Sequence, residues 1–274
     1  MITKLDKQKV RKFISKNFYV LISLLIKLKF RTRIFKKSPI IILTPGKVGS
    51  SSVYRSIRKQ LTNPVFHVHS LQQRHVLNSI KFHKVNNISI PLHLIISKNL
   101  IKKLDSFDGK VYVISIVREP ISRMISSYFQ NIDRYDQNYD FSQIVKTNEK
   151  AVKKLKNHLL DSVSYYDNWF ETELKSNFGI NIYTDFKEKN DRTFYYKKDN
   201  ISLLLMRMED LNRDFPYCSK KFLRLKNEIK LLDSNLGSQK KYFEAYKLLK
   251  KELQIEASLN KKIRSTKFFK TFYY

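Results

Sequence analysis

Residues 39–52 read PIIILTPGKVGSSS, and residues 111–128 read VYVISIVREPISRMISSY. Each segment starts with an apolar run, passes through a short turn containing glycine or proline, and continues with a helical pattern. The two segments therefore predict two strand–turn–helix units. In such a unit, backbone N–H groups and the positive end of a helix dipole face an anion. Two units of this kind suit a ligand that carries phosphate at two ends.

The first turn differs from the better-known phosphate loops. A Walker A loop has a glycine five residues before its Gly-Lys and a Ser or Thr after the lysine. This chain has Ile41 and Val48 at those positions, so an ATPase or kinase of that class is not expected. No G-x-G-x-x-G follows a strand, which excludes the dinucleotide fingerprint. The candidates for phosphate binding are Lys47, Val48, Gly49, Ser50, Ser51 and Ser52. An ordinary helix start with serine caps would give the same pattern.

The second turn pairs an arginine with a serine. Pro120 suits the first turn of a helix, where its missing N–H costs nothing. Arg118 then lies at the end of the strand, and Ser126 follows about two helical turns later. A guanidinium and a hydroxyl placed in this way can converge on one phosphate. The alternative is a structural arginine that pairs with Glu119.

Together, the two segments resemble the sulfotransferase superfamily. Its members carry a 5′-phosphosulfate loop, Pro-x-Lys-x-Gly-(Ser/Thr)-(Ser/Thr), and a 3′-phosphate motif, Arg-(Asp/Glu)-Pro-x-x-Arg-x-x-Ser-x-(Tyr/Phe). The chain matches the second motif throughout residues 118–128 and the first from Lys47 onward. Residues 204–211, LLMRMEDL, are similar to a later family strand that ends in Arg-Tyr-Glu-Asp-Leu, with Met208 in place of the aromatic residue.

Within that superfamily, the chain most resembles bacterial proteins of capsular polysaccharide synthesis. Those proteins show a segment Trp-Phe-x-x-Glu-Leu-x-x-x-Phe-Gly-Ile, here residues 169–180, and a Ser-x-Lys/Tyr-aromatic tail, here near residues 265–269. The resemblance implies an α/β fold with a P-loop-like central sheet. It implies 3′-phosphoadenosine-5′-phosphosulfate as co-substrate, a glycan or glycolipid acceptor, and no metal.

The order of predicted elements leads to a similar fold. Strands alternate with helices, which favours a parallel sheet covered on both faces. We expect a basic helical segment at residues 1–37, then one α/β domain with a helical C-terminal portion at 38–274. Strands are expected at residues 39–43, 64–68, 92–96, 110–117 and 201–206. Helices are expected at residues 53–60, 71–82, 97–104, 120–131 and 167–178, the last ended by Gly179. Two basic helices are expected in residues 220–253, with a break near residues 233–235 and Gly237, and a loop is expected at 133–138.

Sulfuryl transfer to a hydroxyl also needs a group that removes a proton. Residues 65–70, VFHVHS, put His67 and His69 on one face of a strand near its carboxyl end, where open α/β sheets hold their ligands. The segment resembles the His-x-His stretch of hexuronic acid 2-O-sulfotransferases, and that resemblance implies that His69 is the base. A structural histidine pair bonded to loop carbonyls is the alternative. Surface or capping roles are expected for His75, His83 and His93.

The formal net charge of +30 has several candidate causes. Nucleic acid, an anionic membrane or glycan, and a polyphosphorylated nucleotide all attract positive charge. A codon bias toward Lys, Ile and Asn would also produce it. No zinc finger or aromatic RNA-binding signature occurs, so no specific nucleic acid is expected. Cys218 is the single cysteine, which excludes an internal disulfide and favours a reducing, cytoplasmic compartment.

The apolar run at residues 18–26 is too short to span a bilayer, which takes about 20 residues. Basic residues flank it on both sides, and no cleavage site follows, so a secretory signal is not expected. Residues 9–37 either lie as an amphipathic helix on the inner face of the membrane or pack on the domain. Two other functions stay open: a non-catalytic, membrane-associated capsule assembly protein, and a basic nucleic-acid-binding protein.

Overall fold

The computed structural model describes residues 37–86, 88–130, 162–185, 193–232, 243–254 and 257–274, with a few residues in 21–26 and 153–160. Most of the predicted N-terminal segment and the predicted loop at 133–138 lie outside the described residues. The boundary between residues 37 and 38 stays a prediction.

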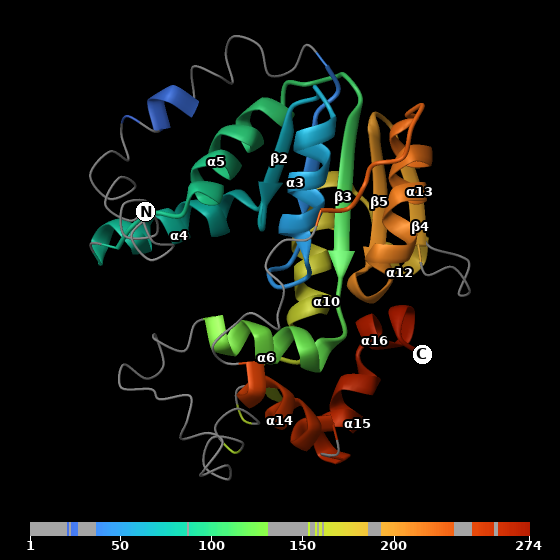
Figure 1. Cartoon of the computed structure of the whole chain (residues 1–274). Helices are drawn as coiled ribbons and strands as arrows, with labels where there is room; N and C mark the ends of the chain where they lie inside the picture. Colours follow the sequence, from blue (N-terminus) through green and yellow to red (C-terminus); the bar gives the residue numbers. More distant parts are fainter. Residues whose placement is uncertain are drawn as a thin grey trace, which may run out of the picture.

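A five-stranded sheet in the order β2-β1-β3-β5-β4 forms the centre of the fold (Figure 1). Its strands are β1 (Ile40–Leu43), β2 (Val65–Val68), β3 (Val111–Val117), β4 (Thr193–Lys198) and β5 (Ile201–Arg207). The first three and β5 are parallel, as predicted, and β4 pairs antiparallel with β5 at the edge. Every residue of β1 and β3 is buried, which explains why these strands are continuous apolar runs.

Helices cover both faces of this sheet, as predicted. One face packs against α5 (Leu92–Leu104), α10 (Tyr165–Phe170) and α16 (Lys267–Phe272). The other face packs against α3 (Ser50–Gln60) and α13 (Leu211–Leu223). A separate apolar cluster joins α6 (Pro120–Gln130), α14 (Phe243–Gln254) and α15 (Ala257–Ser265), which lie together beyond the carboxyl end of β3 (Figure 1). The remaining elements are α4 (Gln73–Val85), a π-helical turn (Glu171–Lys175), α11 (Ser176–Phe178), α12 (Ile182–Asp185) and a 3₁₀ turn (Met208–Asp210).

Two predicted elements are wrong. The strand expected at residues 92–96 is the first part of α5, which begins directly after Pro91. Its apolar run belongs to a longer helical pattern, in which Leu94, Ser97 and Leu100 are buried at helical spacing. The first of the two helices predicted in residues 220–253 is also wrong. The structure has α13, which ends at Leu223 because Arg224 adopts a left-handed conformation with φ of 55°. The helix expected at 167–178 does end at Gly179, whose φ is 64°.

None of the described helices combines the length and the apolar character that crossing a membrane requires.

Candidate functional site

The two predicted strand–turn–helix units are present, and their turns touch. β1 and β3 are parallel neighbours, so the loops that follow them leave the same edge of the sheet. The Arg118 guanidinium donates through Nη1 to the carbonyl oxygen of Lys47 at 3.1 Å. The Arg123 guanidinium donates through Nε to the carbonyl oxygen of Gly46 at 3.3 Å. Both arginines of the second motif therefore hold the loop of the first.

The loop between β1 and α3 has a backbone suited to an anion. Lys47 and Gly49 have φ values of 73° and 78°, while Val48 between them is not in the positive-φ region. Alternation of this kind turns successive N–H groups toward one side and forms a concave nest. Gly49 precedes α3 without a side-chain cap, and the first turn of α3 holds no acidic residue. The positive end of this helix therefore has no carboxylate of its own in that turn.

The other residues predicted in this loop contribute in different ways. The Val48 side chain is fully buried in the core, so only its backbone N–H can serve a ligand. The Ser50 hydroxyl is buried and lies 2.8 Å from Nε2 of His67. Ser51 and Ser52 are half-buried in the first turn of α3, and the Ser52 N–H already donates to the carbonyl oxygen of Gly49 at 3.1 Å. The candidate anion contacts are thus mainly the backbone N–H groups that precede Ser52.

The start of α6 differs from that of α3. The Glu119 carboxylate accepts hydrogen bonds from the N–H groups of Ile121 and Ser122, at 2.9 and 2.8 Å. The prediction that the second helix N-terminus faces an anion is therefore wrong, since a carboxylate of the chain caps it. The proposed pairing of Arg118 with Glu119 is not what the structure has either, because Glu119 serves the cap. An anion at the second unit would have to be held by side chains.

Arg118 is the centre of that side-chain group. It donates to the Ser126 hydroxyl at 2.8 Å, which matches the predicted pairing, and through Nη2 to the Tyr246 hydroxyl at 2.9 Å. Together with the Lys47 contact, these bonds use three of the five guanidinium N–H groups. Among the described residues, no acidic side chain pairs with Arg118, and none of them neutralises its charge.

The histidines gather beside the same loop. Nδ1 of His69 lies 2.9 Å from the carbonyl oxygen of Thr44. A carbonyl only accepts, so Nδ1 carries the proton, and the neutral ring keeps a lone pair on Nε2. Burial lowers the pKa of His69, which favours this neutral form. The ring centroid of His93, from α5, lies 5.1 Å from that of His69.

His67 and His69 do share a side of the sheet, with ring centroids 5.0 Å apart. The His67 ring also stacks on Tyr54, with centroids 5.5 Å apart. Burial, together with the nearby His69, lowers the pKa of His67 to about 4. Of the histidines assigned to the surface or to caps, His83 bonds the backbone of its own helix and His75 is exposed, but His93 belongs to this cluster.

We expect the melting temperature to fall as the pH is lowered from about 6.5 to about 4. The unfolded chain takes up a proton on His67 near the ordinary value of 6.5, whereas the folded protein does so near 4. Protons therefore favour the unfolded state within this window. Below about pH 4, His67 causes no further loss of folding stability. Thermal denaturation at several pH values in this window measures how steeply the melting temperature depends on pH.

His67→Gln is the informative variant, because an amide can still bond the Ser50 hydroxyl but does not titrate. Its melting temperature should depend less steeply on pH than that of the wild type. His93, whose pKa burial lowers to about 3, still titrates in this variant and leaves some slope. Equal slopes for wild type and variant would contradict the assignment.

The second half of the chain supports these residues. The Trp169 indole donates to the carbonyl oxygen of His69 at 3.1 Å. The Glu173 carboxylate, only 2% exposed, accepts from the Ser70 hydroxyl at 2.5 Å and the Leu71 N–H at 2.6 Å. The Tyr166 hydroxyl donates to the carbonyl oxygen of Arg118 at 3.0 Å.

Sequence reasoning did not assign these roles. Glu173 occupies the Glu position of the quoted segment at 169–180, so that motif could have identified it. Glu173 lies in the π-helical turn, a distortion that is frequent at functional sites. Tyr246 lies far along the chain in α14, and no motif identifies it.

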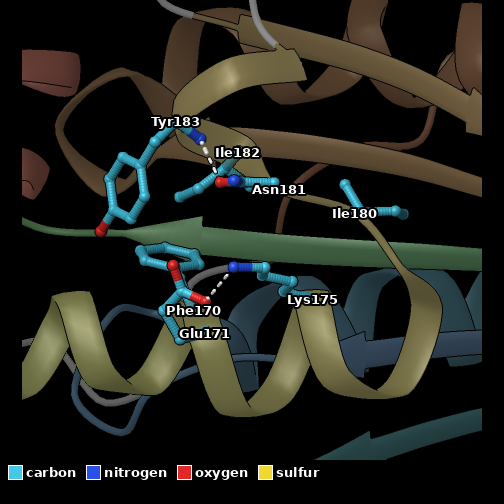
Figure 2. Close-up of a pocket in the computed structure, with 7 residues that line it drawn as sticks. All are labelled: Phe170, Glu171, Lys175, Ile180, Asn181, Ile182 and Tyr183. Atoms are coloured by element: carbon cyan, nitrogen blue, oxygen red, sulfur yellow. Dashed lines mark hydrogen bonds and ion pairs between the residues drawn. The ribbon is translucent and has the colours of Figure 1, made fainter.

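A pocket beside the π-helical turn is lined by Phe170, Glu171, Lys175, Ile180, Asn181, Ile182 and Tyr183 (Figure 2). Its polar groups already have partners. Lys175 pairs with Glu171 at 2.8 Å, and the Asn181 side-chain oxygen accepts from the Tyr183 N–H at 3.1 Å. The Tyr183 hydroxyl donates to Asp167. We therefore place the candidate site at the two loops and not in this pocket.

Comparison with known proteins gives one family. Residues 143–274, just under half of the chain, match the NKWYS family, described as "Putative capsular polysaccharide synthesis protein". The matched part contains Trp169, Glu173 and Tyr246, which support the candidate site, but neither of the two loops predicted to bind phosphate. Neither the curated proteins nor the solved structures gave a match. The comparison thus supports the predicted link to capsular polysaccharide synthesis and says nothing of sulfuryl transfer.

Proposed function

We propose that this protein transfers a sulfuryl group from 3′-phosphoadenosine-5′-phosphosulfate to a carbohydrate hydroxyl, in the synthesis of a capsular or surface polysaccharide. The observation that carries the proposal is the Arg118 guanidinium, which bonds the first loop and Ser126 at once. Two anion-binding groups joined in this way suit a nucleotide with phosphate at its 3′ and 5′ positions. The family description supports the polysaccharide part.

The residues of the chain fit such a nucleotide in two places. The nest at Lys47 and Gly49, with the start of α3, would hold the 5′-phosphate. Arg118 and Ser126 would hold the 3′-phosphate, and Tyr246 keeps the guanidinium in position. The donor supplies an activated sulfuryl group whose leaving group is a phosphate. Lys47 would offset the negative charge that grows on that leaving group. This scheme requires no metal.

His69 would act on the acceptor. Its Nδ1 proton is held by Thr44, so Nε2 is the nitrogen that can accept the proton of a sugar hydroxyl. Trp169 holds the backbone of His69 and so limits its movement. His67 is the weaker candidate, because its Nε2 already contacts Ser50.

Arg118→Ala should weaken the binding of adenosine 3′,5′-bisphosphate far more than the binding of adenosine 5′-monophosphate. Loss of a charge-assisted contact costs roughly 1.5–3 kcal/mol, which is roughly 10- to 150-fold in affinity. Titration calorimetry of both nucleotides with wild type and variant measures the difference. The matched control is Arg213→Ala, which removes an exposed arginine paired with Asp214 and should leave both affinities unchanged.

Equal losses for the two nucleotides would reject the 3′-phosphate assignment. No binding of either nucleotide to the wild type would favour a non-catalytic capsule assembly protein. A tighter, steeply salt-dependent affinity for oligonucleotides would favour a nucleic-acid-binding protein.

A further inference from the structure

Most of the net positive charge of the chain lies in its first part, because that part has almost no acidic residues. Residues 7–104 contain 21 lysines and arginines and no aspartate or glutamate. In the described residues, this part supplies β1, α3, β2, α4 and α5. These described elements therefore carry no acidic side chain, and among them β2 forms the edge of the sheet with α4 and α5 beside it (Figure 1).

The exposed apolar side chains are concentrated in the same part. Among the described residues, the large hydrophobic side chains at the surface are of two kinds: four tyrosines in scattered places, and eight leucine, isoleucine, valine or phenylalanine residues. All eight lie in residues 21–25 or in the α4–α5 hairpin. Those of the hairpin form what we call the apolar corner: Leu77, Phe82, Val85, Ile88 and Leu92.

Phe82 and Val85 are the most exposed members of this corner, at 58% and 73%. They lie in the last turns of α4, next to the exposed Lys81 and Lys84. Ile26 packs against the buried side of the same hairpin, which brings the exposed leucines of residues 21–25 close to it. Apolar side chains flanked by lysines, with no acidic residue nearby in the sequence, are typical of a surface that lies on anionic lipid.

We propose that the apolar corner is a contact surface for a bilayer that contains anionic lipid. Phe82 and Val85 would enter the boundary between headgroups and acyl chains, while Lys81 and Lys84 would meet the lipid phosphates. Charge complementarity selects this occupant over two others. A symmetric second copy would place the same lysines against one another. Residues 1–36 carry eleven lysines and arginines against one aspartate, so they have the same sign as the corner.

The corner adjoins the candidate acceptor side of the site. Leu92 belongs to the corner, and the next residue, His93, lies against the ring of His69. This step rests on the proposed function. Contact with the bilayer would then bring His69 close to an acceptor sugar that is attached to a lipid. The binding experiment below uses no enzymatic readout, so its result is independent of the proposed function.

The test is sedimentation of the full chain with phosphatidylcholine vesicles, with and without phosphatidylglycerol. The wild type should bind the vesicles that contain phosphatidylglycerol and bind pure phosphatidylcholine weakly. Phe82→Ser/Val85→Ser should weaken binding about tenfold or more, because it removes the apolar contact and keeps every charge. Tyr217→Ser is the matched control, since Tyr217 is 60% exposed on α13, and it should bind as the wild type does.

Several outcomes would overturn the proposal. One is that the wild-type protein stays in the supernatant while the vesicles sediment, and another is that the double variant binds as tightly as the control. Loss of binding in Lys81→Glu/Lys84→Glu alone, with the serine variant unaffected, would mean a charge contact without the apolar corner. A wild-type dimer in sedimentation equilibrium that the serine variant abolishes would assign the corner to a second copy of the chain.

Discussion

His69→Ala should abolish sulfuryl transfer while the binding of adenosine 3′,5′-bisphosphate survives. A positioned general base contributes roughly 10²- to 10⁴-fold to the rate, and Nε2 of His69 is the candidate nitrogen for this role. The nucleotide affinity should persist because, on the proposed function, His69 would contact the acceptor and not the donor phosphates. Single-turnover rates and calorimetry on the same preparation measure the two effects separately.

The pH profile adds a second criterion. Because burial lowers the pKa of His69 below its usual 6.5, the wild-type rate should begin to fall only at a pH below that value. His67→Gln serves as the control and should retain most of the turnover, since its ring faces Ser50. Near-normal turnover of His69→Ala on a verified acceptor would move the base to His67 or to a carboxylate.

Lys47→Ala should lower turnover strongly and leave the affinity for adenosine 3′,5′-bisphosphate within about tenfold, because its charge would act mainly in the transition state. The loss expected for one such group is on the order of 10²- to 10³-fold. Lys47 has a positive φ, which alanine tolerates poorly. Lys47→Asn removes the same charge with a residue that accepts this conformation more readily, and should show the same loss.

Lys59→Ala, at the exposed end of α3, is the matched control for a lost lysine. Unchanged turnover in both Lys47 variants would mean that the loop is structural or that another cation offsets the charge. A loss confined to Lys47→Ala would assign the effect to backbone strain and not to the ammonium group.

The sequence predicted what depends on near neighbours along the chain. Arg118 and Ser126 are two helical turns apart, so their contact follows from one strand end and one helix. The touching loops follow from the parallel neighbours β1 and β3. The Arg118 to Tyr246 contact could not be predicted, because it depends on how α14 packs against α6.

Other differences between the predicted and observed structure have local causes. The start of α5 has the apolar run of a strand, and only its packing separates the two readings. The edge strand β4 shows no clear alternation, since three of its last four residues are exposed. The sequence does not reveal that Glu119 caps the start of α6, because the same side chain also suggests an ion pair with Arg118.

The contact between Arg118 and Tyr246 has a consequence for synthesis of the protein on the ribosome. Both loop segments have been synthesised once residue 128 has been added to the chain. The guanidinium, however, receives its Tyr246 partner from a helix translated more than a hundred residues later. Because a domain folds as a unit, Arg118 can gain its full set of partners only when α14 has left the exit tunnel of the ribosome.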